Sequence, residues 1–170
     1  MTRRSCQTLG NMNADRAALQ GQIASAFAAE LVATPKTSLR GAAEIDIGRR
    51  PPAFDLELDS PSPAYLEQHA YDLPFLDAES WRIYLPRLLA LAVSHVGSSD
   101  AVDGLLSSLR PPDTEPPRFA SLSAKQEAAV VAVLDFLAFG EESAHSAAAC
   151  TALEEWWGTA PLYRPRQNVA

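Results

Sequence analysis

Residues 73–96 have the sequence LPFLDAESWRIYLPRLLALAVSHV, and this stretch decides the fold of the chain. Asp77 is a favourable N-cap and Glu79 follows in the first turn, so a helix begins here. From 87 to 96 apolar side chains cover most of the helix circumference, which is typical of a helix buried on all sides. Pro86 predicts a break or kink, because proline has no amide donor and clashes with the preceding turn. We therefore expect residues 87–96 to form the middle of the hydrophobic core.

Further helix signals lie on both sides of this stretch. Upstream, Asn13 can cap a helix whose apolar residues recur at four-residue steps from Leu19 to Leu31. Other starts are indicated by small polar caps, and one by a capping box in which serine precedes glutamine by three residues. These starts lie at Ser38, Ser62-Pro63, 97–100 and Ser123 with Gln126. A last helix is expected from about Glu141 to Trp156 or Trp157.

Together these signals predict an all-α fold, a single domain of about six or seven helices over residues 13–157. A chain of 170 residues with 47% hydrophobic residues is long enough to bury a core of its own. We expect a disordered tail at 1–12, with Met12 as an alternative translation start, and a C-terminal tail at 158–170 that is ordered only by docking.

Two segments rich in proline interrupt the helices. Residues 48–63 form an acidic, extended segment in which FDLELD, at 54–59, alternates strictly between apolar and acidic side chains. This alternation predicts an extended segment or short edge strand, with its apolar side on the helices and three carboxylates on the other side. Residues 110–121 read as a proline-rich linker that is extended and exposed.

The net charge of −7 comes from one window of the chain. Residues 44–79 hold nine carboxylates and two arginines, while the remainder holds twelve acids and twelve bases. Nucleic acid is therefore not expected as a partner, since phosphate contacts need clusters of lysine and arginine. A basic protein partner fits such a face, and an ordinary solvated face explains it equally well. The candidate partner-binding acids are Asp55, Glu57, Asp59 and Glu67.

Trp156 and Trp157 are adjacent near the end of the last expected helix. Neighbouring residues of an α-helix point in different directions, so both indoles cannot face the core from one helix. We expect one of them at a rim or partner surface, where tryptophan is enriched, or packed beneath the C-terminal tail.

The sequence carries no motif for catalysis, metal binding or cofactor binding. The three histidines lie on different expected helices, and neither CxxC, HExxH, a glycine-rich phosphate loop nor GxSxG occurs. We therefore expect no enzymatic activity, no cofactor and no metal. An alternative to protein binding is a small-molecule- or metal-responsive regulatory domain with a pocket around the Pro86 kink. Its candidate pocket residues are His69, Tyr71, Tyr84 and His95.

Cysteine usage and apolar runs indicate the compartment. Cys6 and Cys150 lie far apart, which disfavours a disulfide framework and favours a reducing cytoplasm. Cys150 lies among alanines at helical spacing, as a small buried hydrophobe would. The N-terminal residues lack the apolar segment of a secretory signal, and the longest apolar run is too short to span a membrane. We expect a cytoplasmic protein without membrane association, and its oligomeric state stays open.

Two blocks of the sequence resemble an uncharacterised bacterial family, a domain of unknown function. The first is LPFLDAESWRIYLPRLL at 73–89, which is similar to the "FL…YLP…LL" block of that family. The second, at 122–137, is similar to its "LS..Q…FL" block. Trp81 stands where phenylalanine is more usual. The resemblance implies a small, helical, cytoplasmic bacterial protein, and it brings no assigned activity and no catalytic residue.

Overall fold

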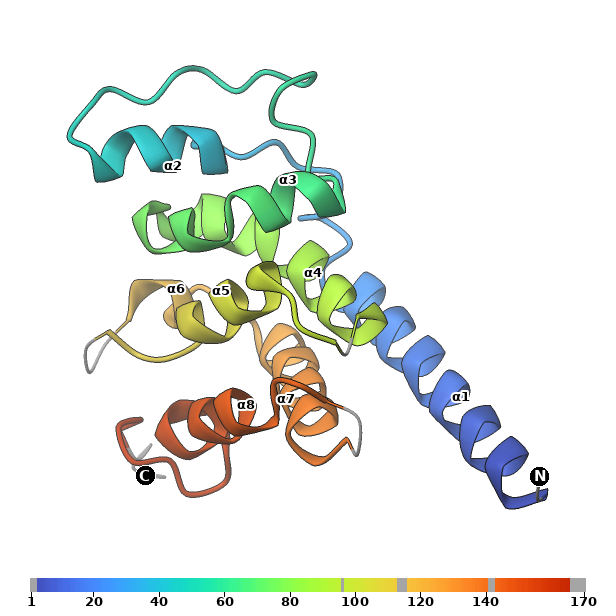
Figure 1. Ribbon diagram of the computed structural model, residues 1–170. Helices are drawn as coiled ribbons and strands as arrows, with labels where there is room; N and C mark the ends of the chain where they lie inside the picture. Colours follow the sequence, from blue (N-terminus) through green and yellow to red (C-terminus); the bar gives the residue numbers. More distant parts are fainter. Residues whose placement is uncertain (1–2, 96, 113–115, 141–142, 166–170) are drawn as a thin grey trace.

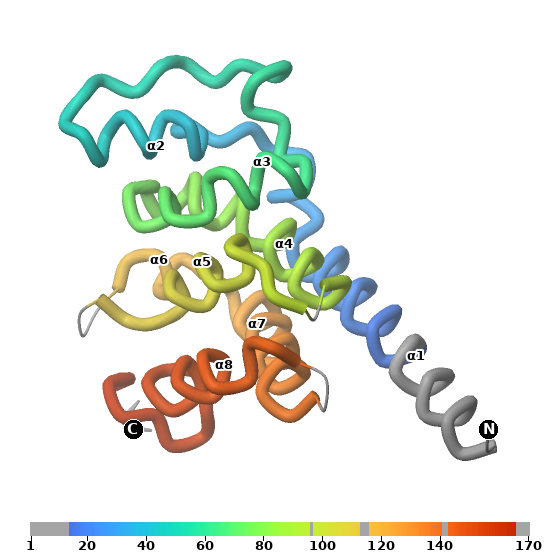
Figure 2. Tube along the Cα trace, in the orientation of Figure 1, coloured from blue at the N-terminus to red at the C-terminus, as the bar shows by residue number. Residues whose placement is uncertain are grey.

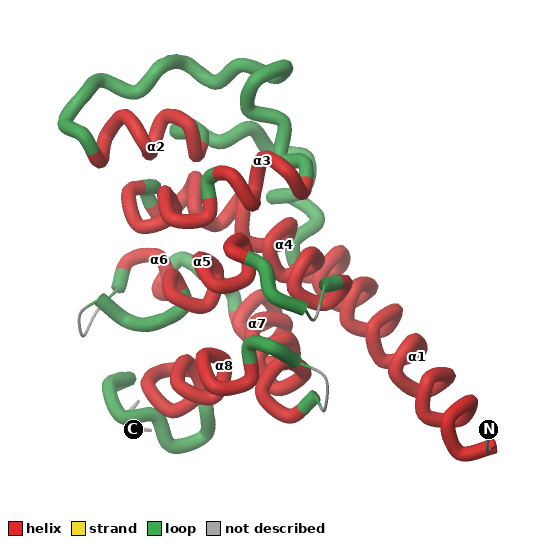
Figure 3. The backbone as a smooth tube through the Cα atoms, viewed as in Figure 1, coloured by secondary structure: helices red, strands yellow, loops and turns green. Residues whose placement is uncertain are grey.

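The computed structural model describes residues 3–95, 97–112, 116–140 and 143–165, with side chains from Ala14 onward. Within these ranges the chain forms helices and loops without a strand (Figure 3), which confirms the all-α prediction. In chain order the elements are α1 Arg3–Ala26, α2 Leu39–Asp46, α3 Pro63–Gln68, the 3-10 helix η1 Ala70–Phe75, α4 Ala78–Ser94, α5 Asp100–Ser108, α6 Pro117–Ala120, α7 Ala124–Phe139, α8 Ser146–Ala152 and the π-helical turn η2 Leu153–Trp157.

Helix α4 lies at the centre of the fold (Figure 1), as the sequence of 73–96 predicts. Asp77 caps it by accepting a hydrogen bond from the Ser80 amide at 2.9 Å. Pro86 is buried inside the helix and does not end it, so the predicted break is absent. Packing on several sides stabilises α4 strongly enough to outweigh the one amide hydrogen bond that proline cannot make.

The other helices surround α4. Helices α1 and α7 pack against α4 and against each other, while α5 packs against α4, η1 and α8, as the trace in Figure 2 also shows. Helix α1 begins at Arg3 rather than at the predicted Asn13 cap, so residues 3–12, expected in a tail, belong to it. Helix α5 approaches η1 so closely that a Cβ atom on Gly104 would lie 2.1 Å from the Ala70 carbonyl oxygen.

Trp156 and Trp157 are both buried, with 6% and 4% of their surface exposed, so the expectation that one lies at a rim is wrong. They belong to η2, whose π-helical turn is wider than that of an α-helix. The wider turn brings both rings against Phe119, with ring centroids 5.3 and 4.8 Å away. The Trp157 indole also donates a hydrogen bond to the Leu109 carbonyl at 2.7 Å. Neither tryptophan is available to a partner in this structure.

The proline-rich segment 110–121 is only in part the exposed linker that the sequence predicts. Its second half forms α6, and Phe119 on that helix is buried between Trp81 and the C-terminal tryptophans. An aromatic ring of this size is buried whenever the fold offers it a contact, because its removal from water is strongly favourable. Residues 113–115 lie outside the described ranges.

The C-terminal segment docks on the domain. The Leu162 amide donates to the Glu154 carbonyl at 2.9 Å, and Arg164 forms an ion pair with Glu127 of α7, also at 2.9 Å. Residues 166–170 lie outside the described part of the chain.

The cysteines and the helix lengths bear on the expected compartment. Cys150 is half-buried against the core, whereas the side chain of Cys6 is not described. Across the described ranges, no helix is long and apolar enough to cross a membrane.

Candidate functional site

The α2–α3 loop, residues 47–62, arches over α2 in Figure 1. The edge strand predicted at 54–59 is not formed, because the chain turns at 56–59, whereas residues 49–55 form neither a helix nor a turn. The Asp55 carboxylate accepts hydrogen bonds from the amides of Glu57 and Leu58 at 2.9 and 3.1 Å, and the Asp59 amide bonds to the Asp55 carbonyl at 2.7 Å. Short acidic side chains that bond to nearby amides favour turns over strands, and here that local bonding overrides the alternating pattern.

Asp59 fixes the end of this turn to the domain. Its side chain is fully buried and accepts hydrogen bonds from Arg40 Nε and Nη2, both at 2.9 Å, from the Tyr65 hydroxyl at 3.2 Å and from the Asp55 amide at 2.8 Å. Burial alone would raise the pKa of Asp59, but these hydrogen bonds and the Arg40 charge hold it below its usual value. Asp59 was a candidate for a partner-binding surface, and its burial removes it from that surface.

The turn does not place the two leucines of the loop on the helices, where the alternating pattern predicts them. Leu56 and Leu58, expected to lie on the helices, are 76% and 61% exposed, and Phe54 is half-buried. Asp55 and Glu57 are exposed as predicted. The loop therefore presents two leucines and two carboxylates to solvent on a turn that is held by hydrogen bonds on the inside.

Other carboxylates of the acidic window have partners within the domain. Glu67 is partly buried and accepts hydrogen bonds from the Ser99 hydroxyl and from the Ala101 amide, the latter at 3.0 Å, at the start of α5. Burial alone would raise the pKa of Glu67, but these hydrogen bonds hold it below its usual value. Asp72 contacts the His69 ring at 2.7 Å. The acidic surface is thus smaller than the sequence indicates.

The predicted ligand-pocket residues do not come together. His69 packs against the Tyr65 ring, with centroids 4.7 Å apart, and pairs with a carboxylate. Tyr71 is 67% exposed and His95 is exposed at the end of α4, whereas Tyr84 is 1% exposed. These four side chains therefore do not form one pocket, and of the four Tyr84 lines a cavity beside α4.

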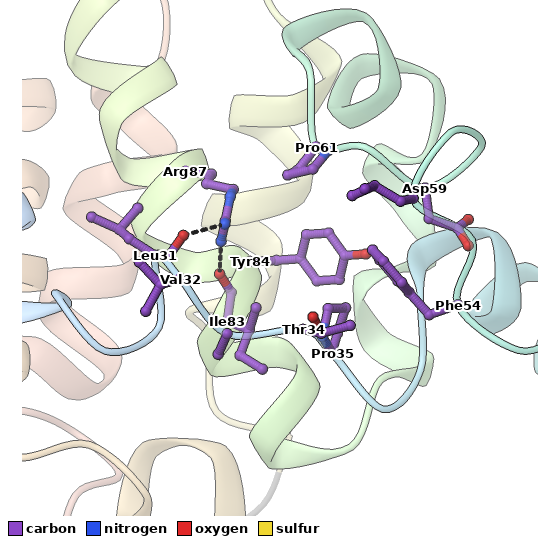
Figure 4. Close-up of a pocket in the computed structure, with 12 residues that line it drawn as sticks. Leu31, Val32, Thr34, Pro35, Phe54, Asp59, Pro61, Ile83, Tyr84 and Arg87 are labelled. Atoms are coloured by element: carbon purple, nitrogen blue, oxygen red, sulfur yellow. Dashed lines mark hydrogen bonds between the residues drawn. The ribbon is translucent and has the colours of Figure 1, made fainter.

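That cavity, the α4 pocket, has a volume of about 180 Å³ and lies between α4, the segment 31–35 that follows α1, and the α2–α3 loop (Figure 4). Apolar side chains form most of its lining. These include Leu31, Val32, Pro35, Phe54, Leu56 and Ile83. Its polar groups come from Thr34, Asp59, Tyr84 and Arg87.

Tyr84 crosses the middle of the α4 pocket, with its hydroxyl directed toward Phe54 (Figure 4). The hydroxyl is buried and makes no hydrogen bond of good geometry within the described chain, although the Tyr65 hydroxyl and the Leu39 amide lie near it. The neighbouring Tyr65 hydroxyl already donates to Asp59 and accepts from the Arg40 amide. Burial, together with Tyr65, raises the pKa of Tyr84, so the phenol stays protonated and can donate a hydrogen bond.

Arg87 lies on the side of the pocket near Leu31 (Figure 4). Its Nη1 donates to the carbonyls of Ile83 at 2.8 Å and Glu30 at 3.3 Å, and its Nη2 donates to the Leu31 carbonyl at 2.8 Å. Within the described ranges no carboxylate forms an ion pair with it. Burial lowers the pKa of Arg87, although an arginine stays charged in proteins.

Arg87 is not among the site residues that the sequence predicts, although one signal points to it. Arg87 is the basic residue within the apolar run around Pro86. Burying a charge in a central helix is costly unless hydrogen bonds or an opposite charge stabilise it. Its neighbours Leu31 and Phe54 come from segments distant in sequence, so the pocket itself had no local signal.

The fold is a small all-α domain. Buried Asp59 anchors its α2–α3 loop, and the partly open α4 pocket lies between this loop and α4. Within the described ranges, no group of three histidine, cysteine, aspartate or glutamate side chains is arranged to hold a metal ion. The chain belongs to DUF6714, a family of unknown function, whose model matches residues 15–160. No curated protein and no solved structure matches the chain.

Proposed function

We propose that this protein is a protein-binding module that contacts its partner with Leu56 and Leu58 of the α2–α3 loop. The exposure of these two leucines, 76% and 61%, is the observation that carries the proposal. Asp55 and Asp59 hold the loop from the inside, so the leucines are presented in one conformation. A preorganised loop loses little conformational entropy on binding, so these two neighbouring leucines are well placed to contact a partner.

The carboxylates beside the leucines favour a basic partner. Asp55 and Glu57 are exposed on the same turn, and the whole chain carries a net charge of −7. Opposite charges steer encounter and fix the orientation of a complex, while apolar contacts supply most of its free energy. An immunity or antitoxin-type protein that neutralises a basic partner in the cytoplasm is a specific role that fits this surface. Catalysis is not part of the proposal.

Capture from the native lysate tests the proposal. The tagged full chain would be compared with a double variant, Leu56→Ser with Leu58→Ser, and bound proteins would be identified by mass spectrometry. Leu162→Ser is the matched control, because Leu162 is 70% exposed but lies on the C-terminal segment. We expect a stoichiometric basic partner that the control retains and the double variant loses.

Charge is tested separately from apolar contact. Glu57→Gln should weaken capture at low salt and matter less at high salt, because salt screens exposed charges. Glu79→Gln provides the control, since Glu79 is also exposed but lies on α4. If the double leucine variant captures the same partner as the wild type, the loop is not the binding surface and the proposal fails.

A further inference from the structure

The α4 pocket has the dimensions and the lining of a small-molecule site. Its volume of about 180 Å³ is close to that of an apolar cavity that holds benzene, roughly 150 Å³. Apolar side chains from three segments form its walls, as in ligand sites generally, where a few polar groups fix the orientation. The occupant is therefore a small molecule of about benzene size.

Two polar groups of the pocket, the Tyr84 hydroxyl and the Arg87 guanidinium, have hydrogen-bond donors left over. The Tyr84 hydroxyl is buried and makes no hydrogen bond of good geometry within the described chain, so its O–H can be donated to a ligand oxygen. The three hydrogen bonds of Arg87 occupy three of the five guanidinium N–H groups, which leaves Nε–H and one Nη2–H. Two neighbouring N–H groups on one guanidinium suit the two oxygens of a carboxylate.

The charge balance of the pocket favours an anion. Asp59 is the carboxylate in its lining, and the two guanidinium hydrogen bonds from Arg40 balance its charge. Arg87 has no such counter-ion among the described residues, so its charge is the one that a ligand would meet. A ligand carboxylate would supply the missing counter-ion in a site partly shielded from water, where ion pairing is stronger.

We propose that the α4 pocket binds a small carboxylic acid with an apolar middle and a second oxygen acceptor, the carboxylate on Arg87 and the second oxygen on the Tyr84 hydroxyl. Figure 4 shows these two donors on different sides of the pocket, Arg87 beside Leu31 and the hydroxyl beside Phe54. The ligand class thus carries its two polar groups at opposite ends. This site goes beyond the proposed loop interaction and does not depend on it.

Calorimetric titration of the purified full chain with three matched compounds tests the assignment. Levulinate has a carboxylate and a ketone, pentanoate lacks the ketone, and pentanamide lacks the charge as well. We expect levulinate to bind about tenfold more tightly than pentanoate, and pentanoate about tenfold more tightly than pentanamide, since each lost hydrogen bond or charge contact is worth roughly that factor. The series tests the role of Arg87 without altering it, which matters because Arg87 also holds the backbone near Leu31.

A variant pair localises the second contact. Tyr84→Phe should abolish the preference for levulinate over pentanoate and leave pentanoate affinity unchanged. Tyr71→Phe is the control, because Tyr71 is exposed and lies outside the pocket, and it should keep the wild-type order. The proposal is overturned if neither acid binds at millimolar concentration, if pentanamide matches pentanoate, or if the ketone preference persists in Tyr84→Phe. Since no partner protein is present, these outcomes leave the loop proposal untouched.

Discussion

Replacing Asp59 by asparagine removes the charge that anchors the α2–α3 loop while keeping the shape of the side chain. The carboxylate is fully buried and accepts four hydrogen bonds, two of them from Arg40. Removing one member of a buried ion pair costs about 3–5 kcal/mol. The Arg40 side chain is 31% exposed, so water can solvate it after the change, and we expect the lower end, about 3 kcal/mol. That is a large part of the roughly 5–15 kcal/mol by which domains are stable.

Urea unfolding and thermal scans measure this loss directly. For a chain of this length, 1 kcal/mol corresponds to about 2–4 °C in Tm, so Asp59→Asn should lower Tm by roughly 6–12 °C. Glu57→Gln, on the exposed side of the same turn, should stay within about 0.5 kcal/mol of the wild type. If both variants unfold alike, Asp59 is not an anchor and the rigid presentation of Leu56 and Leu58 is unsupported.

The difference in stability between the wild type and Asp59→Asn should also depend on pH. The pKa of Asp59 is lower in the folded protein than its usual value of 3.8, so its contribution is fully present above that value and is lost as pH falls through the folded pKa. The stability difference between wild type and Asp59→Asn should therefore be constant near neutral pH and shrink below about pH 4. A difference that stays constant into strong acid would contradict the buried charge pair.

Three further substitutions test separate features of the fold by urea unfolding. Tyr84→Phe should raise stability by about 1–2 kcal/mol, because it removes a buried hydroxyl that has no partner, and a loss would mean that the hydroxyl is satisfied in solution. Gly104→Ala should cost about 3 kcal/mol or more, since the new Cβ would lie 2.1 Å from the Ala70 carbonyl oxygen, and a smaller cost would show that α5 can shift. Trp157→Phe should cost about 1–3 kcal/mol, because the buried Leu109 carbonyl loses its donor, and a neutral result would argue against that hydrogen bond.

If both proposals hold, one loop serves two purposes. Leu56 is exposed at the turn and also lines the α4 pocket, as does Phe54 from the same loop. An occupied pocket would support the loop from beneath, and linkage requires any ligand that favours the binding conformation to strengthen partner binding equally. Levulinate should then raise partner affinity at an about tenfold lower concentration in the wild type than in Tyr84→Phe, which a capture assay over a range of acid concentrations can measure.

The sequence by itself determined where several helices start and which helix is central, although α1 begins at Arg3 and not at the predicted Asn13 cap. Asp77, Ser62 and Ser123 were read as caps, and each accepts the expected backbone hydrogen bond. The apolar residues of α4 placed that helix in the core, because a helix apolar on all sides must be buried on all sides. These features depend on residues a few positions apart, so a local sequence pattern is enough to predict them.

Only the tertiary structure decided which acidic and aromatic residues outside those helices are buried. Asp59 of the α2–α3 loop is buried because Arg40 of α2 supplies the opposite charge. The alternating pattern around Asp59 does not predict that pairing. Both C-terminal tryptophans are buried because they pack against Phe119. Phe119 itself comes from a segment whose composition predicts an exposed linker. The α4 pocket likewise exists only where three distant segments meet. Contacts between residues far apart in the chain depend on the free energy of the whole fold, to which packing and charge pairing contribute. A local sequence pattern does not predict them.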